Sequence, residues 1–341
     1  MEFSWQAFSL NVRMHTGDVV NQADWIRKKA RNAGRGCAFI PLSLMLFLVG
    51  CSVSKLYTNS LESKAKRLGL QGHQVQLGSA NVHYWMGGEG PPLLILHGFG
   101  GDSLRTWSGQ IRALSKHHTL ILPDMVFFGQ SYAEGEPSLG LQVETFLKLI
   151  RHVGLGPVDV MGISYGGFVT LQMRRDDPEM VRRLIVVDSP GGHFDDDDEA
   201  AFLARFNAES PADIFIPQDW RGVRQIMQLV FYRPPWLPPW VYRDVKNVVF
   251  SANHFEHGLL LGDLRGRRSE FLEQDWSDTE ALVVWGAHDP VFPVDLGQKL
   301  SDNLGAPLVV FEEAAHGPNL EHAGRFNRLV IGWLKDGSVV N

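Results

Sequence analysis

Short runs of apolar residues recur along most of the chain, separated by turns and by segments with helical spacing of apolar positions. Uninterrupted apolar runs of this length are typical of strands buried on both faces of a parallel sheet. They occupy residues 93–96, 119–122, 158–161, 183–187, 281–285 and 307–311. Two further runs, at 74–77 and 82–85, flank a turn and predict a hairpin. Apolar positions with a period of 3.6 predict helices at 107–114, 141–153, 168–175 and 326–334. This alternation predicts an α/β fold with a doubly wound, mostly parallel sheet.

One stretch breaks this rhythm, because residues 190–275 contain no buried strand run. The stretch lies between two predicted strands, so we expect a helical cap inserted over the carboxyl ends of the strands. The sheet domain would then consist of residues 71–189 and 276–341. An aromatic and proline-rich patch lies within the cap. Its large side chains are Phe231, Tyr232, Trp236, Leu237 and Trp240. We expect them to form the apolar wall of a binding site; the alternatives are that they form the core of the cap or a lipid-facing surface.

The N-terminal region has the charge and hydropathy pattern of an export signal. A basic cluster from Arg27 to Arg35 precedes an apolar run at 37–49, as in the n- and h-regions of a signal peptide. The run is shorter than the roughly 20 apolar residues of a membrane span. It ends in Leu-Val-Gly-Cys51, which resembles the bacterial lipobox. We therefore expect residues 1–51 to be an extension and signal with lipidation at Cys51; an uncleaved anchor and an ordinary cleaved signal are the alternatives.

Lipidation would decide where the protein works. The mature chain would begin at Cys51 and be held at a membrane surface, with residues 52–70, which are polar and charged, as a tether or a first helix. By resemblance to Gram-negative lipoproteins, Ser52 favours the outer membrane over the inner one. We expect an exported protein that faces the periplasm or the exterior, with an inner-membrane signal anchor as the alternative.

Composition narrows the class of protein. A chain of 341 residues, 44% of them hydrophobic, can bury the core of one large α/β domain. The net charge is −6 and the second half has no strong basic block, which argues against nucleic acid as a partner. The only cysteines are Cys37 and Cys51, so the rest of the chain can build neither a disulfide nor a cysteine metal site. The acidic run at 195–199 is interpreted as a solvated loop rather than a calcium site.

The strand predicted at 158–161 leads into Gly162-Ile-Ser164-Tyr-Gly166, and a helical pattern follows directly. Gly-x-Ser-x-Gly between a strand and a helix is the pattern of a nucleophile elbow. The serine stands on a tight, strained turn, where side chains two residues away on either side would collide with the neighbouring strand and helix. The turn exposes the hydroxyl group and directs N–H groups of the helix start toward the same space. Ser164 is therefore the candidate nucleophile.

A serine hydroxyl group needs a base at neutral pH, and the base needs an acid that orients it. Asp289 and His316 each come just after a predicted strand. Both should emerge at the same edge of the sheet as Ser164, in the chain order serine, acid, histidine. Asp188 also follows a predicted strand and is the competing acid. The order of the loops favours Asp289.

The glycine-rich segment His97-Gly-Phe99-Gly also follows a predicted strand. Such a loop can turn backbone N–H groups toward a substrate oxygen, so the N–H groups of Phe99 and Tyr165 are the candidate oxyanion hole. We interpret His97 as structural, holding the loop by hydrogen bonds. His288 and His322 are interpreted as non-catalytic.

Taken together, these motifs resemble the α/β-hydrolase superfamily over roughly residues 70–335. The resemblance rests on Leu96-His-Gly-Phe-Gly-Gly, Pro123-Asp-Met-Val-Phe-Phe-Gly-Gln-Ser, Gly162-Ile-Ser-Tyr-Gly-Gly, Trp285-Gly-Ala-His-Asp and Ala315-His-Gly-Pro-Asn-Leu-Glu. Within the superfamily the chain is similar to lipases and esterases near the monoacylglycerol lipases and the meta-cleavage hydrolases. The latter usually place Trp soon after the catalytic His and Pro in the oxyanion loop. Here Gly317-Pro318 follows the histidine, and Gly100-Gly101-Asp102 follows Phe99. Both differences argue against a meta-cleavage hydrolase.

The resemblance implies a serine esterase or lipase that acts on apolar acyl esters through a Ser–Asp–His triad and an acyl-enzyme, without a cofactor or metal. Its partners would be a small apolar ester or lipid and a membrane surface. Hydrolysis of a C–C bond in a ring-fission product is the alternative reaction. A catalytically silent binding protein on the same fold is a third hypothesis, against which the complete Ser164, Asp289 and His316 set argues.

Overall fold

A computed structural model describes residues 52–339. The signal-like segment and the predicted lipidation site Cys51 lie outside this range. Among the described residues, no helix combines the length and the apolar character needed to cross a membrane.

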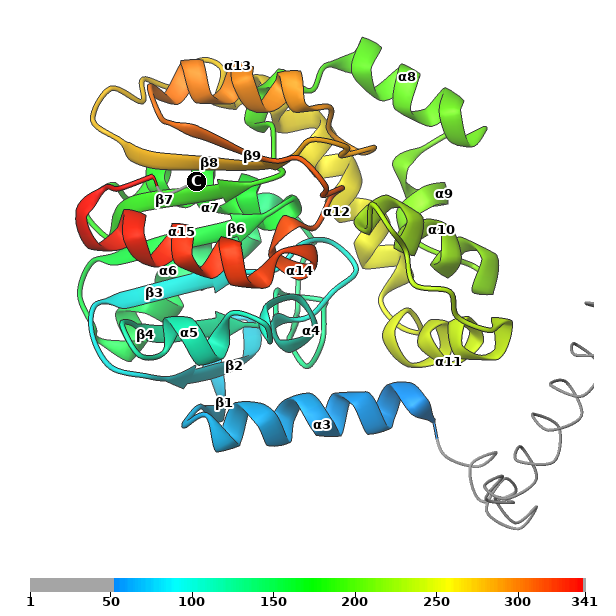
Figure 1. Cartoon of the computed structure of the whole chain (residues 1–341), viewed down its shortest axis with the longest axis horizontal. Helices are drawn as coiled ribbons and strands as arrows, with labels where there is room; N and C mark the ends of the chain where they lie inside the picture. The colour runs from blue at the N-terminus through cyan, green and yellow to red at the C-terminus, as the bar shows by residue number, and fades with distance from the viewer. Residues whose placement is uncertain (1–51, 340–341) are drawn as a thin grey trace, which may run out of the picture. The chain divides into compact units, whose positions relative to one another are not determined.

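A nine-stranded sheet forms the centre of the domain (Figure 1). Its order is β1-β2-β4-β3-β6-β7-β8-β9, with the two-residue β5 paired to β2. Strands β3, β4 and β6 to β9 pair in parallel, whereas β2 pairs antiparallel with its neighbours. The strands are β1 Gln71–Leu77, β2 Ala80–Gly87, β3 Pro92–Leu96, β4 Thr119–Pro123, β5 Tyr132–Ala133, β6 Val158–Ile163, β7 Val181–Val187, β8 Glu280–Gly286 and β9 Leu308–Phe311. The predicted mostly parallel sheet is confirmed, and β5 is the strand that the apolar pattern missed.

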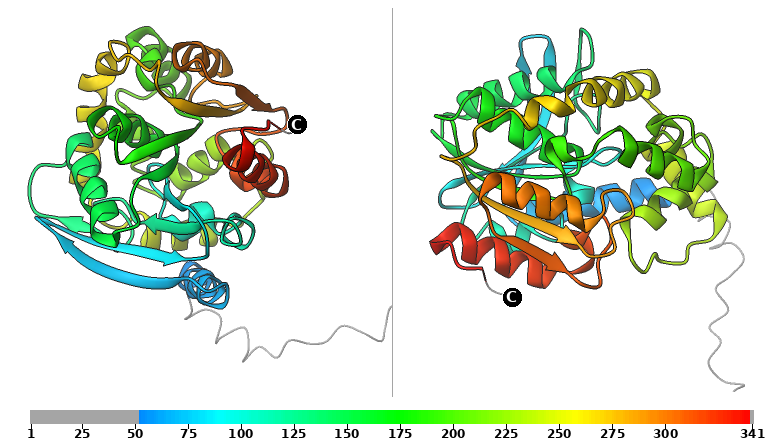
Figure 2. Two further views of the ribbon diagram at one scale, coloured as in Figure 1. Left: turned by 90° about the vertical axis from the view of Figure 1, so that its left-hand side faces the viewer. Right: turned by 90° about the horizontal axis from the view of Figure 1, so that it is seen from above.

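Helices cover both faces of the sheet (Figure 2). Alternate residues of β3 belong to different core clusters. Leu94 belongs to the cluster that includes side chains of α6, α7 and α13, and Leu93 belongs to the one that includes side chains of α3, α4, α5 and α15. The single helix predicted at 107–114 is not formed, because α4 ends at Trp107 and α5 begins at Ile111. The helices outside the cap are α3 Val53–Arg67, α4 Ser103–Trp107, α5 Ile111–Leu114, α6 Leu139–Val153, α7 Tyr165–Asp176, α13 Val294–Leu304, α14 Pro318–Glu321 and α15 Ala323–Asp336.

Most of the segment predicted as a tether or a first helix is a helix of the domain. Ser52 caps α3 by accepting a hydrogen bond from the Lys55 N–H. Leu61 of α3 is buried in the core, and the N–H of Ser54 donates to Asp244 of the cap at 2.6 Å. Residues 53–67 are therefore packed against the sheet domain and the cap, which contradicts a tether and agrees with the alternative of a first helix.

The stretch between β7 and β8 is helical and lies beside the carboxyl ends of the strands (Figures 1 and 2). The acidic run predicted as a solvated loop begins its first long helix: Asp195 caps α8, and the buried Glu199 pairs with Arg268 at 3.0 Å. The cap elements are η1 Gly191–His193, α8 Asp196–Phe206, α9 Pro211–Phe215, α10 Trp220–Val230, α11 Pro239–Val249, α12 His254–Arg267 and η2 Arg268–Phe271.

Candidate active site

Ser164 occupies a strained turn between β6 and α7. Its φ of 53° and ψ of −121° lie in a region that a residue with a side chain rarely adopts. The flanking glycines are required by close packing, since a Cβ at Gly166 would lie 2.5 Å from the carbonyl oxygen of His97. A Cβ at Gly162 would likewise collide with the backbone of Gly166 and the side chain of Thr170. The structure thus reproduces the predicted elbow and leaves Ser164 partly accessible.

His316 and Asp289 meet at the same edge of the sheet. His316 Nδ1 lies 2.7 Å from Asp289 Oδ2, and both side chains are buried. The other carboxylate oxygen accepts hydrogen bonds from the N–H groups of Val291 at 2.7 Å and Phe292 at 3.1 Å. The Asp289 carboxylate is therefore fixed by three donors, and it holds the imidazole with Nε2 free to act as a base.

The glycine-rich loop lies against the elbow. A Cβ placed on Gly98 would be 3.3 Å from the Cβ of Ser164. Within the described residues, the N–H groups of Phe99 and Tyr165 donate to no backbone acceptor. Two free N–H groups beside a serine hydroxyl are the arrangement that stabilises a developing oxyanion. Burial raises the pKa of the Tyr165 hydroxyl group, which therefore stays neutral.

Two buried side chains hold this loop in place. His97 Nδ1 lies 2.8 Å from the Gly98 carbonyl oxygen, and its Nε2 accepts a hydrogen bond from Met125 N–H at 2.8 Å. Burial lowers the pKa of His97, so the ring is neutral and the predicted structural role is confirmed. Asp124 accepts hydrogen bonds from both the N–H and the hydroxyl group of Ser103, at 3.0 and 2.6 Å. Burial acts to raise the pKa of Asp124, but the hydrogen bond from His83 and the other contacts keep it below its usual value.

A family model for the alpha/beta hydrolase fold matches residues 91–323, which include Ser164, Asp289, His316 and the glycine-rich loop. The chain belongs to the α/β hydrolase fold family.

Relatives within and around this family differ in their reactions. The chain is 28% identical to a 2-hydroxymuconate semialdehyde hydrolase of Pseudomonas putida over 74% of its own length and 90% of that protein. Among solved structures, a candidate lipase from Acinetobacter baumannii AYE has a TM-score of 0.72 at 19% identity, covering 82% of this chain and 96% of that one. A membrane phospholipase A has a TM-score of 0.69 at 21% identity, covering 93% and 98%. Family membership therefore shows a hydrolase of the α/β kind.

Asp188, the competing acid, lies close to this α/β-hydrolase site but is not bonded to the histidine. It is fully buried, and its Oδ1 accepts a hydrogen bond from Gly286 N–H at 2.8 Å. One oxygen of Asp188, one of Asp289 and one ring nitrogen of His316 lie within 4.8 Å of one another. Such spacing can also suit a metal ion, but both oxygens of Asp289 already accept N–H donors. The geometry favours Asp289 as the partner of the histidine.

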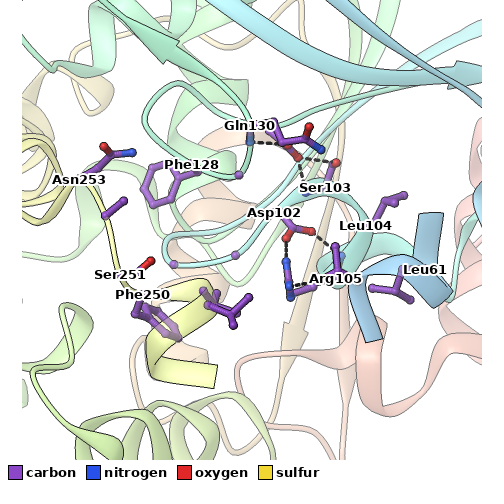
Figure 3. Close-up of a pocket in the computed structure, with 18 of the residues that line it drawn as sticks. Leu61, Asp102, Ser103, Leu104, Arg105, Phe128, Gln130, Phe250, Ser251 and Asn253 are labelled. Carbon is purple, nitrogen blue, oxygen red and sulfur yellow. Dashed lines mark hydrogen bonds and ion pairs between the residues drawn. The ribbon is translucent and has the colours of Figure 1, made fainter. Parts of the chain in front are cut away.

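Aromatic rings surround Phe99 on the side facing the cap. Its ring centroid lies 5.1 Å from that of Phe128, 5.3 Å from His257 and 6.2 Å from Phe215. Burial lowers the pKa of His257, so this ring is neutral at pH 7. A cavity of about 500 Å³ opens beside the same loop, between α3 and the cap, and Phe128 and His257 are among its lining residues (Figure 3).

The structure corrects the predicted wall of cap residues. Trp236 is 86% exposed and Trp240 is 56% exposed, so neither encloses a binding site. Tyr232 stacks on His288 with ring centroids 4.4 Å apart. Leu237 packs within a small cluster of the cap itself, and Phe231 ends α10. This proline-rich segment runs along the outer surface, and Phe215 and His257 take the place next to the site.

Glu321 is a site residue that the sequence analysis did not identify. Its Oε2 accepts a hydrogen bond from the N–H of Ala315 at 2.9 Å, and its Oε1 accepts one from the N–H of Tyr232 at 2.9 Å. It thereby connects the loop that carries His316 to the cap. The available signal was its position at the end of the Ala315-His-Gly-Pro-Asn-Leu-Glu motif.

Proposed function

We propose that the protein is a serine hydrolase that cleaves carboxylic esters with apolar acyl groups. The observation that carries the proposal is the buried 2.7 Å contact between His316 Nδ1 and Asp289 Oδ2, at the sheet edge where Ser164 stands on its strained turn. An imidazole held in this way is oriented to accept the proton of the serine hydroxyl group, whereas a free imidazole in solvent has no fixed orientation.

The reaction follows from these positions. Ser164 Oγ attacks the ester carbonyl carbon while His316 Nε2 accepts its proton, and the N–H groups of Phe99 and Tyr165 stabilise the oxyanion. The C–O bond to the alcohol then breaks, and His316 returns the proton to the leaving oxygen. Water repeats the sequence on the acyl-enzyme and releases the acid. Asp289 stays ionised throughout and stabilises the imidazolium.

Two observations support an apolar acyl group. The rings around Phe99 carry no formal charge at pH 7, because burial lowers the pKa of His257 and keeps this ring neutral. The candidate lipase and the membrane phospholipase A share the fold, which is compatible with a place near the monoacylglycerol lipases. The rival substrate, a ring-fission product such as a 2-hydroxymuconate semialdehyde, is a carboxylate, and a buried carboxylate needs positive or N–H partners.

A substrate panel tests the proposal. Chromogenic esters of increasing acyl length are assayed beside a dienoate substrate of C–C hydrolases. We expect hydrolysis of the esters, with kcat/KM rising with acyl length and no comparable turnover of the dienoate. Faster cleavage of the dienoate than of every ester would establish the C–C reaction instead. Binding of the esters without turnover would support the silent binding protein.

The same panel tests which cap residue contacts the acyl group. Phe215→Ala removes a ring that packs against Phe99, so kcat/KM for the longest ester should fall about tenfold or more relative to the shortest, as expected for lost apolar contacts in a binding site. Trp236→Ala is the matched aromatic control, since its side chain is exposed. A change of acyl preference in Trp236→Ala but not in Phe215→Ala would support the sequence-based prediction that Trp236 lines the binding site.

We further propose that the enzyme is exported and anchored by lipid on Cys51. The support is the signal-like sequence that ends at this residue. Each buried methylene group of an acyl chain contributes about 0.8 kcal/mol to membrane binding, so several chains anchor stably. A lipoprotein of the outer membrane would place the hydrolase beside lipid esters.

Metabolic labelling with a palmitate analogue tests the anchor. Wild type and Cys37→Ser should incorporate the label, Cys51→Ser should not, and mass spectrometry should find Cys51 at the mature N-terminus. An unlabelled protein that keeps residues 27–50 and stays in the membrane would indicate a signal anchor. The same uncleaved protein in the cytosol would contradict export.

A further inference from the structure

Asp188 lies beside the Asp289–His316 pair, yet the mechanism above does not use it. It follows the last residue of β7 and is fully buried. Its φ of +44° lies in the left-handed region that residues other than glycine rarely adopt. Backbone strain of this kind persists only where the surrounding structure enforces it, and it is common at functional sites. The position therefore calls for an explanation beyond packing.

The two oxygens of Asp188 have different surroundings. Oδ1 accepts a hydrogen bond from Gly286 N–H at 2.8 Å, whereas Oδ2 has no hydrogen-bond partner in the part of the chain that the structure describes. A buried oxygen without a partner is costly, and a buried carboxylate with a single donor is poorly stabilised. A protonated carboxyl group avoids the buried charge and gains an O–H that can donate.

Asp289 has the opposite environment. It accepts hydrogen bonds from two backbone N–H groups and from His316, which suits an ionised carboxylate. Two carboxyl groups this close cannot both be ionised at low cost. Burial, followed by the nearby charge of Asp289, raises the pKa of Asp188 well above its usual value; Glu321 acts in the same direction and the Gly286 N–H acts against it. With His316, these are the titratable groups that face Asp188 from the loops after β8 and β9 and from α14.

We infer that Asp188 is a positioning residue whose carboxyl proton is directed at the Asp289 carboxylate, and that it thereby sets how strongly His316 binds a proton. One oxygen of Asp188, one of Asp289 and a ring nitrogen of His316 lie within 4.8 Å of one another, and Oδ2 is the Asp188 oxygen without a partner among the described residues. A donor on Asp289 withdraws negative charge from the oxygen that faces the imidazole. This lowers the proton affinity of His316 and keeps it a free base near neutral pH. The inference rests on the proposed function, in which His316 is the base.

The pH dependence of activity in two variants tests the inference. The acidic limb of the kcat/KM profile, and of the rate of labelling by a fluorophosphonate, reports the ionisation of the base in the free enzyme. Asp188→Leu removes the donor while keeping a side chain branched at Cγ, so the limb should move to higher pH by about half a unit to one unit, and activity below the limb should fall about three- to tenfold. Asp188→Asn keeps a neutral N–H donor and should leave the limb in place.

The direction of the shift separates the alternatives. If Asp188 were ionised, its removal would take a negative charge from beside His316 and move the limb to lower pH, which would overturn the inference. A lower melting temperature with an unmoved limb in Asp188→Leu would show a structural role only. If Asp188→Leu does not fold, Asp188→Ala, which also lacks a donor, replaces it, and an unmoved limb there counts against the inference. A wild-type enzyme that neither labels nor hydrolyses esters would contradict the proposed function itself.

Discussion

Ser164→Ala is expected to abolish labelling by a fluorophosphonate and to lower ester hydrolysis by about 10⁴- to 10⁶-fold. The reason is that the hydroxyl oxygen is the atom that forms the acyl-enzyme, and no other group can replace it. The side chain of Ser164 makes no hydrogen bond with the described residues, so removal of its hydroxyl group breaks none. The melting temperature should therefore stay close to that of the wild type.

Ser251→Ala is a suitable control, because Ser251 lines the cavity beside the oxyanion loop but lies in the cap (Figure 3). It should label and hydrolyse esters as the wild type does. Mass spectrometry of the labelled peptide locates the adduct. An adduct on another serine, or labelling that survives in Ser164→Ala, would show that the nucleophile has been assigned to the wrong residue.

Much of the fold could be predicted from the sequence because buried parallel strands have a strong local signal. The run at 93–96, for example, becomes β3 with one added residue. Segments without such a signal could be predicted less well. The buried apolar residues of helix α3 are Leu61 and Ala65. Two such residues among many polar ones form too narrow an apolar stripe to predict a packed helix from the sequence. At 107–114, the sequence Ser-Gly-Gln interrupts the apolar pattern, and Asp102 starts a separate short helix.

The candidate triad could be proposed from the sequence because its members follow strand ends, and the carboxyl ends of parallel strands meet at one edge of a sheet. That argument places Ser164, Asp289 and His316 together from their order alone. It cannot place cap residues, since a helical insertion has no fixed register against the sheet. Phe215, rather than Trp236, therefore came to lie next to Phe99. The environment of Asp188 depends on distances between three loops, which no local pattern encodes.

Asp289→Asn is expected to slow ester hydrolysis by about 10⁴-fold while the protein stays folded. An asparagine keeps an oxygen that can accept the hydrogen bonds from the N–H groups of Val291 and Phe292, so the loop should hold its shape. Its amide group, however, would present N–H to His316 Nδ1. The imidazole would then carry its proton on Nε2, where the proton of Ser164 has to be accepted.

Asp188→Asn provides the matched control for this variant, since both residues are buried, both lie within 4.8 Å of a nitrogen of His316, and both changes are isosteric. We expect kcat within a few-fold of the wild type, because an already neutral carboxyl group is replaced by a neutral amide group. Melting temperatures of the two variants should be measured together, so that loss of activity is not confused with unfolding. If Asp188→Asn were the more damaging change, the negative charge that stabilises the imidazolium would reside after β7 rather than after β8. The 2.7 Å contact of His316 with Asp289 would then orient the ring without supplying that charge.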